Sequence, residues 1–349
     1  MSSTVIGLDI GNGVIRAAEI ADAGKARPTL VRYHSIAVPT SAVQRGEVVE
    51  QGTFASALKQ LWANAGFKSK KVVLGMGNQR VLVRDLSLPK MPLDRIRESL
   101  PFHAQDLLPV PVGDALLDFY PISTGDGDNG EVINGLLVAA IKDAVLHNVE
   151  AVQAAGLDPV EVDLIPFALA RSMLGGMDAP GTVGLIHVGA TTSSVIVARD
   201  GIPQFVRIMQ NGGDDVTGAL VQRLGMTSEQ AEQVKRAIGL APTGTTAEWA
   251  PAVEAMTRST NDLLDGVRNT LSFYLNSRPG VAIDKLMLSG GAAQLIGLPN
   301  ALAEATRLSV GIPNPLGRFA LGRQLDATRL RTEYSGVAVA AGLAMGSRA

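Results

Sequence analysis

The chain has 349 residues, of which 46% are hydrophobic and 18% charged, enough apolar sequence to bury the cores of two or three domains. Its 31 basic and 33 acidic residues leave a net charge of −2, and aromatic residues make up 4%, so the composition argues against a nucleic-acid-binding protein. The absence of cysteine excludes disulfides, thiolate-ligated zinc and a cysteine nucleophile.

The N-terminal sequence MSSTVIGLDIG lacks the basic and long apolar regions of a signal peptide. The most apolar runs, 132–141 and 336–346, are shorter than the ~20 residues that a membrane-spanning helix needs. We therefore expect a soluble, cytoplasmic protein.

Hydrophobic spacing predicts alternating strands and helices in the first half of the chain. In segment 50–65, Phe54, Leu58 and Leu61 recur at helical spacing and would share one face. The stretch TGDGDNGE at 124–131 predicts an acidic turn between two strands. We predict strands at 29–38, 72–76, 80–88, 115–123 and 133–141, and helices at 50–65, 92–107, 142–156 and 164–174.

The second half also alternates strands and helices, which indicates α/β layering. A Pro/Gly/Thr loop at 241–246 separates two of its helical segments, and Gly212-Gly213 leads into a helix. We predict strands at 203–209, 285–288 and 309–312, and helices at 215–224, 227–238, about 250–276, 297–307 and 335–346.

Two distant segments, 7–19 and 184–197, resemble one another. Each has an apolar β run, a turn of glycine and small or polar residues, and a second β-branched run, which is typical of a β-hairpin with a small-residue tip. One such hairpin in each half of the chain suggests two related domains that face one another.

Several common site motifs are absent or misplaced. No GxxxxGK[ST] loop occurs, and the four histidines are scattered, without HExxH. GxGxxG occurs at Gly125, Gly127 and Gly130, but its aspartates would repel a pyrophosphate and a strand follows it, so we interpret it as a surface turn.

Three glycine-bearing turns remain, at 9–13, 189–193 and 289–292. Each by itself is more often a tight hairpin than a binding site. Together, two hairpins can clamp a polyphosphate with backbone N–H groups, and a Gly-Gly turn lets a flat base lie against the backbone. Asp9 beside the first turn can hold Mg²⁺ through its waters.

Three segments carry a resemblance to the nucleotide motifs of a known superfamily. They are LDIGNGVIRAAEI, which resembles a first phosphate motif, GLIHVGATTSSVIVARDGIPQFVRIMQNGGDDVT, which resembles a second phosphate motif, and LMLSGGAAQLIGLPNAL, which resembles an adenosine motif. The sequence thus resembles the actin-like ATPase superfamily and, within it, the PilM family of type IV pilus assembly proteins, which is related to FtsA. The PilM insert is similar to LSLPKMPLDRIRESLPFHAQDLLPVPVGDALLDF, and its connecting helix to EVDLIPFALARS.

This resemblance implies an α/β actin-like ATPase fold, with two RNase H-like domains facing a nucleotide cleft and an inserted SHS2-like subdomain. The implied division is 1–79 with 158–178 (domain IA), 80–157 (inserted subdomain IC), 179–225 with 277–349 (domain IIA) and 226–276 (domain IIB).

The resemblance also implies ATP and Mg²⁺ as cofactors. Asp9, Gly11, Asn12, Gly13 and Arg16 would serve the first phosphate loop, and Gly189, Thr191, Thr192 and Ser193 the second. Gly290, Gly291 and Ala292 would lie by the adenosine, and Glu232 and Lys235 would flank the ribose and base. Glu232 and Lys235 are also one helical turn apart, so an exposed ion pair within the helix is an equal alternative.

One position departs from the family. The second phosphate motif usually begins with Asp, whereas this chain has His187, which adds no negative charge to hold a hydrated Mg²⁺. His187 would either donate to a phosphate oxygen or be a satisfied polar group. We predict nucleotide binding with weak or absent hydrolysis. Asp163 is a candidate for orienting a water, and a surface residue before a helix is the favoured alternative.

For partners, the resemblance implies the N-terminal cytoplasmic peptide of the inner-membrane protein PilN, and other pilus motor components. The peptide would lie in a groove between domain IA and the inserted subdomain, and 102–111 could line it, although such a stretch is more often helix core and exit turn. The chain ends in AVAAGLAMGSRA, without the basic amphipathic helix of FtsA, so we expect attachment to the inner face of the cytoplasmic membrane through a protein. The alternatives are a small-molecule kinase of the same superfamily and an FtsA-like filament-forming protein.

Overall fold

The computed structural model describes residues 5–128, 130–175, 181–240, 247–332 and 334–346. The chain divides into two compact units. Unit 1 comprises Met1–Ala179, Ala198–Ile208 and Asn314–Ala349, and unit 2 comprises Pro180–Val197 and Met209–Pro313. The predicted loop at 241–246 lies outside the described residues.

Unit 1 is built on a six-stranded sheet with the order β10-β6-β1-β2-β3-β16. A hairpin forms its centre, since β1 pairs antiparallel with β2, and β6 and β10 are added in parallel. The strands are β1 (Ile6–Gly11), β2 (Val14–Ala21), β3 (Thr29–Ala37), β6 (Lys71–Met76), β10 (Asp158–Leu164) and β16 (Ala320–Leu321), and a small separate ribbon joins β4 (Val43–Gln44) and β5 (Glu47–Val48).

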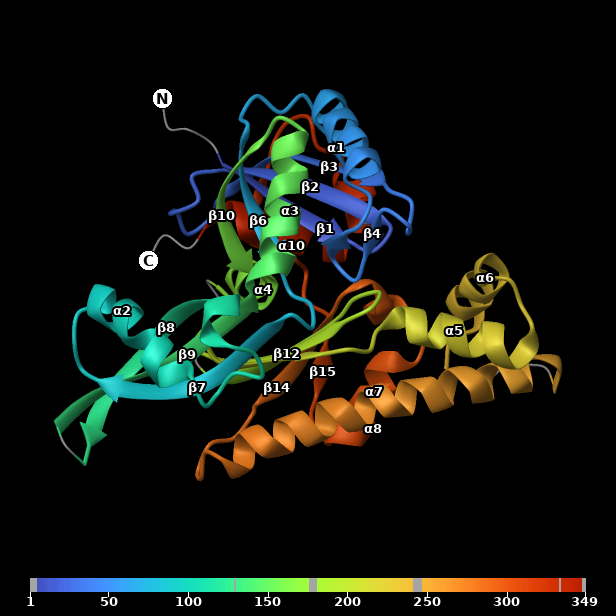
Figure 1. The fold of residues 1–349 in the computed structure, drawn as a ribbon. Coiled ribbons are helices and arrows are strands. Elements are labelled where there is room, and N and C mark those ends of the chain that lie inside the picture. The colour runs from blue at the N-terminus through green and yellow to red at the C-terminus, as the bar shows by residue number, and fades with distance from the viewer. Residues whose placement is uncertain (1–4, 129, 176–180, 241–246, 333, 347–349) are drawn as a thin grey trace. The chain divides into compact units, whose positions relative to one another are not determined.

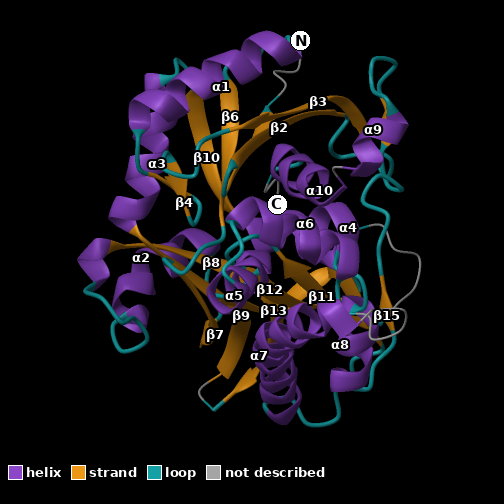
Figure 2. Cartoon of the chain, turned by 90° about the vertical axis from the view of Figure 1, so that its right-hand side faces the viewer, coloured by secondary structure: helices purple, strands orange, loops and turns teal. Residues whose placement is uncertain are grey.

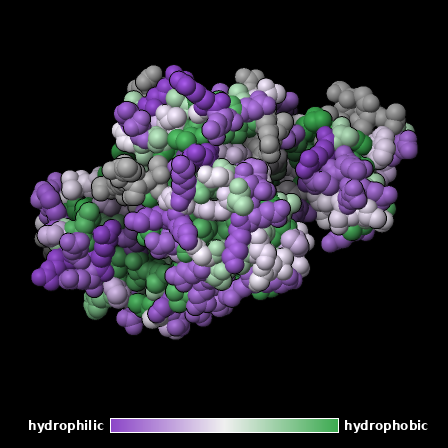
Figure 3. Space-filling view, turned by 90° about the horizontal axis from the view of Figure 1, so that it is seen from above, coloured by the Kyte–Doolittle hydropathy of each residue, from purple (hydrophilic) through white to green (hydrophobic). Residues whose placement is uncertain are grey.

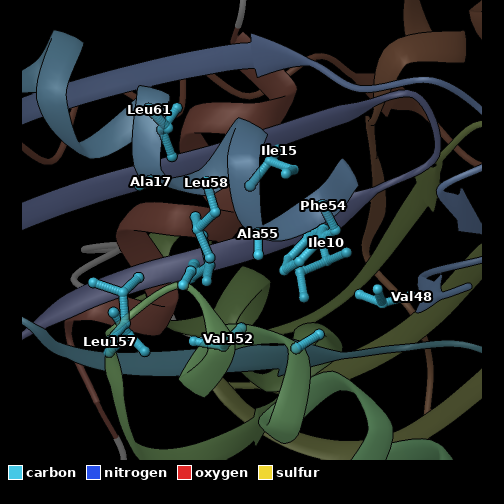
Figure 4. Close-up of a cluster of buried hydrophobic side chains, with 14 of the residues drawn as sticks. Ile10, Ile15, Ala17, Val48, Phe54, Ala55, Leu58, Leu61, Val152 and Leu157 are labelled. Carbon is cyan, nitrogen blue, oxygen red and sulfur yellow. The ribbon is translucent and has the colours of Figure 1, made fainter. Parts of the chain in front are cut away.

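One face of this sheet is covered by α1 (Gln51–Ala65) and α3 (Lys142–Ala154) (Figure 1). Alternate residues of β1 and β2 point to this face, where Phe54, Leu58 and Leu61 of α1 are fully buried (Figure 4). The helical spacing predicted for segment 50–65 is therefore confirmed. Because alternate strand residues point to opposite faces, the other face of the sheet needs a second cover.

The second cover is α10 (Tyr334–Ala344), together with α4 (Ile165–Met173) (Figure 2). A Cβ at Gly7 would overlap the backbone of Ala340 and Ala344, so a glycine is required where α10 crosses β1. This helix lies in unit 1, because it is almost wholly apolar and buries its small side chains against Ala18 and Leu30 of that unit.

Unit 1 also contains an antiparallel sheet of order β7-β9-β8, made of β7 (Val81–Pro89), β8 (Ala115–Gly127) and β9 (Gly130–Ile141). Helix α2 (Leu93–Ala104) packs on it through Ile96, Leu100 and Ala104, while a short 3-10 turn, η1 (Val112–Asp114), precedes β8. In contrast, α3 shares the core of the six-stranded sheet. The predicted four-domain division stays a prediction, since the structure separates two units.

Unit 2 contains most of a five-stranded sheet and a group of helices. The sheet has the order β13-β12-β11-β14-β15, with strands β11 (Thr182–Val188), β12 (Ser193–Arg199), β13 (Ile202–Met209), β14 (Lys285–Ser289) and β15 (Val310–Gly311). The helices are α5 (Gly213–Leu224), α6 (Ser228–Ile238), α7 (Ala250–Asn276) and α8 (Leu298–Thr306), with 3-10 turns η2 (Ala247–Trp249) and η3 (Gly291–Gln294). Val216 and Leu220 of α5 pack with Met256 of α7 in a core of their own.

Several elements have other bounds than predicted, and some elements of the structure were not predicted. Strand β8 ends at Gly127 and strand β9 begins at Gly130, so both extend into the predicted turn at 124–131. The strands and the α-helix that were not predicted are β4, β5, β10, β16 and α9 (Ala327–Thr332).

The surface mixes polar and apolar residues, as Figure 3 shows for the face that it presents. Among the large apolar side chains at the surface, Phe102 of α2 is 80% exposed. Across the described ranges, no helix combines the length and the apolarity that crossing a membrane requires.

Candidate functional site

The first predicted phosphate turn joins β1 and β2 in unit 1. Gly11 pairs with Val14, so Asn12 and Gly13 form the two-residue connection, and Gly13 adopts φ +77°. This left-handed conformation favours glycine. The register also places Asp9 opposite Arg16, with both side chains on the α10 face of the sheet.

Asp9 and Arg16 form an ion pair within this hairpin. The Nη1 of Arg16 donates to Oδ2 of Asp9 over 3.1 Å, and Asp9 is 6% exposed. Burial raises the pKa of the Asp9 carboxyl above its ordinary 3.8, and the charge and hydrogen bond of Arg16 only partly oppose that rise. The two residues predicted to serve the same phosphate loop thus hold each other.

Two glycines make room for the Arg16 side chain. A Cβ at Gly11 would lie 2.9 Å from Nη1 of Arg16, and a Cβ at Gly336 of α10 would overlap the Arg16 side chain near Nε. Gly11 was predicted as a phosphate-loop residue, and its absent side chain is explained here by Arg16. The Gly336 contact was not predicted, because nothing in the sequence relates it to a residue 320 positions away.

The predicted magnesium site was tested against the oxygens present. Asp9 is the acidic group beside the first turn, and the guanidinium that occupies its Oδ2 would repel a cation. Elsewhere in the described residues, no group of three or more His, Asp or Glu side chains is arranged to hold a metal. The described side chains alone therefore form no ready-made metal site, and Mg²⁺ held through water by Asp9 beside nucleotide phosphates stays a prediction.

The second predicted turn joins β11 to β12 in unit 2 and is fastened to the start of α5. The amides of Gly213 and Asp214 donate to the carbonyl oxygens of Gly189 and Ala190, over 2.9 and 2.8 Å. The preceding amide, of Gly212, donates to Oδ2 of Asp215 over 2.7 Å. Because these three amides at the helix N-terminus already have acceptors within the chain, this end of α5 is capped from inside.

The three hydroxyl residues of this turn have different surroundings. Thr191 and Thr192 are half-buried, and the Thr192 carbonyl accepts from the Gly189 amide over 2.9 Å. Ser193 is fully buried, and its hydroxyl donates to the Asn211 carbonyl over 2.7 Å. Thr191 and Thr192 can therefore meet a ligand at the surface, whereas Ser193 holds β12 to the segment before α5.

The two glycines of the third predicted turn are explained differently. Gly290 has φ +99°, and a Cβ there would overlap the backbone of Val188, so the crossing of β11 requires a glycine. Gly291 begins η3, and a Cβ on it would meet no atom within 4 Å. The contacts of the fold do not require a glycine at 291, and its predicted place beside the adenosine stays a prediction.

Glu232 and Lys235 of α6 lie in a hydrogen-bonded cluster with α5. Nζ of Lys235 contacts the Gly213 carbonyl at 3.1 Å, Oγ1 of Thr217 at 2.8 Å and Oε2 of Glu232 at 2.6 Å. The Thr217 hydroxyl lies 2.9 Å from Oε2 of Glu232, and Nε of Arg236 donates to Oε1 over 2.8 Å. Burial alone would raise the pKa of Glu232, but the hydrogen bonds from Lys235 and Arg236, with the Lys235 charge, lower it.

The segments predicted in unit 2 meet at Gly213. A Cβ on this residue would lie 3.6 Å from the Ala292 side chain, 3.6 Å from the Gly189 carbonyl and 3.7 Å from Nζ of Lys235. The second turn, η3 and α6 thus converge on the first residue of α5. Gly213 and Thr217 were not among the predicted site residues. The Gly212-Gly213 pair before a predicted helix was the feature of the sequence that could have identified Gly213.

His187 lies at the end of β11, beside Ser289 of β14 in the parallel register. Its Nδ1 is 3.0 Å from Oγ of Ser289. This contact agrees with the predicted alternative of a satisfied polar group. The phosphate-donor alternative stays a prediction.

Asp163 is a buried residue of β10 rather than a surface residue. Its Oδ1 accepts from the Leu164 amide over 2.7 Å, and its Oδ2 accepts from Nη2 of Arg171, which also donates to the Gly342 carbonyl. Burial raises the pKa of Asp163, against the opposing charge of Arg171. The carboxylate therefore ties β10, α4 and α10 together, and its predicted role towards a water has no support in these contacts.

Comparison with known proteins gives the family and the fold. The family described as type IV pilus assembly protein PilM matches residues 7–348. The cell division protein FtsA of Bacillus subtilis (strain 168) is 21% identical over 227 residues, covering 58% of this chain and 51% of FtsA. The chain thus spans about half the length of this curated relative.

Two solved structures extend the comparison. One titled "PilM-PilN type IV pilus biogenesis complex" is 26% identical, has a TM-score of 0.83 and covers 98% of both chains. MreB5 of Spiroplasma citri, bound to ADP, is 12% identical with a TM-score of 0.54, covering 99% of this chain and 97% of its own, which shows the shared fold. The fold is therefore the α/β actin-like ATPase fold, as predicted, and the chain belongs to the PilM family of type IV pilus assembly proteins.

Proposed function

We propose that this chain is an ATP-binding scaffold of a type IV pilus assembly complex at the inner face of the cytoplasmic membrane. The observation that carries the proposal is the similarity over 98% of both chains to a PilM that is solved in complex with PilN. MreB5, which shares the fold, is solved with bound ADP, and this supports a nucleotide as the ligand of this chain.

The contacts in unit 2 support a particular assignment of the adenosine end. The open space over Gly291 accommodates a flat base against the backbone, and Glu232, 35% exposed along its side chain, supplies an ionised acceptor for ribose hydroxyls. Thr191 and Thr192 of the second turn and Arg16 of the first serve the phosphates. Arg16 can do so by exchanging the Asp9 carboxylate for a phosphate oxygen, because a guanidinium binds both in the same forked geometry.

We propose further that ATP is turned over weakly or not at all. The acidic residue usual at the start of the second phosphate motif is replaced by His187. The carboxylate that this position would add to hold a hydrated cation beside the phosphates is therefore missing, which leaves Asp9 as the single predicted anchor.

Calorimetric titration of the full chain with ATP tests this function, with and without Mg²⁺. We expect saturable binding in both conditions and a hydrolysis rate well below ~1 s⁻¹. His187→Asp restores the usual carboxylate, so a rise in turnover in that variant would show that the remaining catalytic groups are in place. Hydrolysis by the parent chain at or above ~1 s⁻¹ would contradict weak turnover, and no heat of binding would contradict the nucleotide site.

The proposed protein partner is the N-terminal cytoplasmic peptide of PilN, with other components of the pilus motor as further partners. An extended peptide gains backbone hydrogen bonds and side-chain pockets when it adds to a folded surface. A synthetic peptide with the N-terminal cytoplasmic sequence of PilN, immobilised on beads, should retain the chain. A scrambled peptide of equal composition should not. Equal retention by both peptides would overturn this part of the proposal.

A further inference from the structure

The Thr217 hydroxyl is the junction of the hydrogen-bonded cluster in unit 2. Its oxygen lies 2.8 Å from Nζ of Lys235, which can only donate, and 2.9 Å from Oε2 of Glu232, which is ionised and can only accept. Thr217 therefore accepts from Lys235 and donates its single proton to Glu232. The Gly213 carbonyl is a more distant alternative acceptor at 3.3 Å.

Lys235 has no proton left for a ligand. An ammonium group has three N–H bonds, and its Nζ contacts three acceptors, which are the Gly213 carbonyl, Thr217 and Glu232. The Lys235 side chain is also largely buried, at 13% exposed. The lysine thus fixes the cluster, and Glu232 is the member able to accept another hydrogen bond, since a carboxylate offers about four lone-pair positions.

Thr217 also restricts the position of the Glu232 carboxylate, whose other oxygen is bound by an exposed side chain. Oε1 of Glu232 accepts from Arg236, whose side chain is 78% exposed and is therefore a weak anchor. Without the Thr217 hydroxyl, Glu232 would keep one buried partner and one solvent-exposed partner. Its carboxylate would then occupy more than one rotamer.

We propose that Thr217 is a positioning residue that fixes the Glu232 carboxylate to accept a ribose hydroxyl, and thereby sets the preference of the site for ribonucleotides. The proposal rests on the proposed function, because it concerns the sugar of the same nucleotide. Thr217 acts through Glu232 and does not itself contact the ligand.

Calorimetric titration of the full chain with ATP, 2′-deoxy-ATP and 3′-deoxy-ATP tests the proposal. A site that hydrogen-bonds a sugar hydroxyl rejects the analogue that lacks it, so we expect about tenfold weaker binding of at least one deoxy analogue. Thr217→Val removes the hydroxyl while keeping the shape, and should bring that affinity ratio close to one. Thr217→Ser should restore it. Thr260→Val, a matched change of a buried threonine outside the cluster, should leave the ratio unchanged.

A double-mutant cycle separates positioning from a general loss of packing. If Thr217 acts through Glu232, Thr217→Val should change the ratio no further in a Glu232→Gln background. Thr217→Ala replaces the valine variant if a melting curve shows that the latter does not fold.

The outcomes distinguish this inference from the proposed function. ATP binding with an unchanged ratio in the Thr217 variants, or additive effects of Thr217→Val and Glu232→Gln, would overturn the inference alone. Absence of ATP binding by the parent chain would overturn the proposed function and the inference with it.

Discussion

Two threonines of α7 are buried alike and differ in one hydrogen bond. Thr260 is 1% exposed, and its hydroxyl has no partner among the described residues, whereas Thr270 is 3% exposed and donates to the Gly266 carbonyl over 2.8 Å. A buried hydroxyl without a partner costs free energy, so we expect Thr260→Val to stabilise the chain by about 1 kcal/mol.

Thermal unfolding measures this difference. A gain of that size should raise the melting temperature by about 2–4 °C. Thr270→Val is the matched control in the same helix, and it should lower the melting temperature because it removes a hydroxyl that is satisfied. Destabilisation by both substitutions would show that the Thr260 hydroxyl has a partner after all.

The lowered pKa of Glu232 predicts a pH dependence. A carboxyl whose pKa is lower in the folded state than the ordinary 4.5 stabilises the fold above pH 4.5, and this contribution is lost as pH falls through the folded pKa. We expect the melting temperature of the parent chain to exceed that of Glu232→Gln at pH 7, and the difference to shrink below pH 4.5. A difference that stays constant from pH 7 to pH 3.5 would contradict the ion pairs seen around Glu232.

At this scale, sequence reasoning identified the residue types of the site but not their partners. Glu232 and Lys235 were predicted from a resemblance, and their spacing on a helix predicted an exposed ion pair. The structure contains the ion pair, but the Lys235 side chain is largely buried. Thr217 could not be predicted, because its role depends on how α5 packs against α6. Asp163 was expected at the surface, because no feature of the neighbouring sequence indicates its ion pair with Arg171, which also contacts α10.

The start of η3 offers a test at the scale of an element, because Gly290 and Gly291 are glycines for different reasons. Gly290→Ala should destabilise unit 2, since the new Cβ would overlap the Val188 backbone at φ +99°. Gly291→Ala should leave the melting temperature nearly unchanged, since its Cβ meets no atom within 4 Å, but should weaken ATP binding if the base lies against this backbone. Unchanged ATP affinity in the Gly291 variant would show that the base does not lie against η3.

Elements with a strong hydrophobic period were predictable, and those specified by tertiary pairing were not. Helix α1 shows the period clearly, and its start and end agree with the prediction to within one residue. Strand β10, with the sequence DPVEVDL, combines charges, a proline and an irregular pairing with β6, and nothing local distinguishes it from a loop. The acidic stretch 124–131 was assigned to a turn from its composition, yet most of its residues belong to the ends of β8 and β9.

For the whole molecule, similarity between the two glycine-bearing hairpins correctly indicated one hairpin in each half of the chain. Their residues fall in different units, β1 with β2 in unit 1 and β11 with the start of β12 in unit 2. The allocation of the C-terminal helix was beyond sequence reasoning. A short apolar helix can be buried against either unit. The contact of α10 with Gly7, where a Cβ would overlap the helix backbone, shows that α10 covers β1.

The separate cores of the two units predict two unfolding transitions in scanning calorimetry. Gly7→Ala, which forces a Cβ into the α10 backbone, should lower only the transition of unit 1, and Thr260→Val should raise only that of unit 2. These variants identify the transitions before ligand is added. A ligand at 100 times its Kd stabilises the fold that binds it by about 2.7 kcal/mol. If Arg16 and Glu232 contact the same ATP, saturating ATP should raise both transitions, whereas a shift of one alone would mean that the residues of the other unit do not bind it.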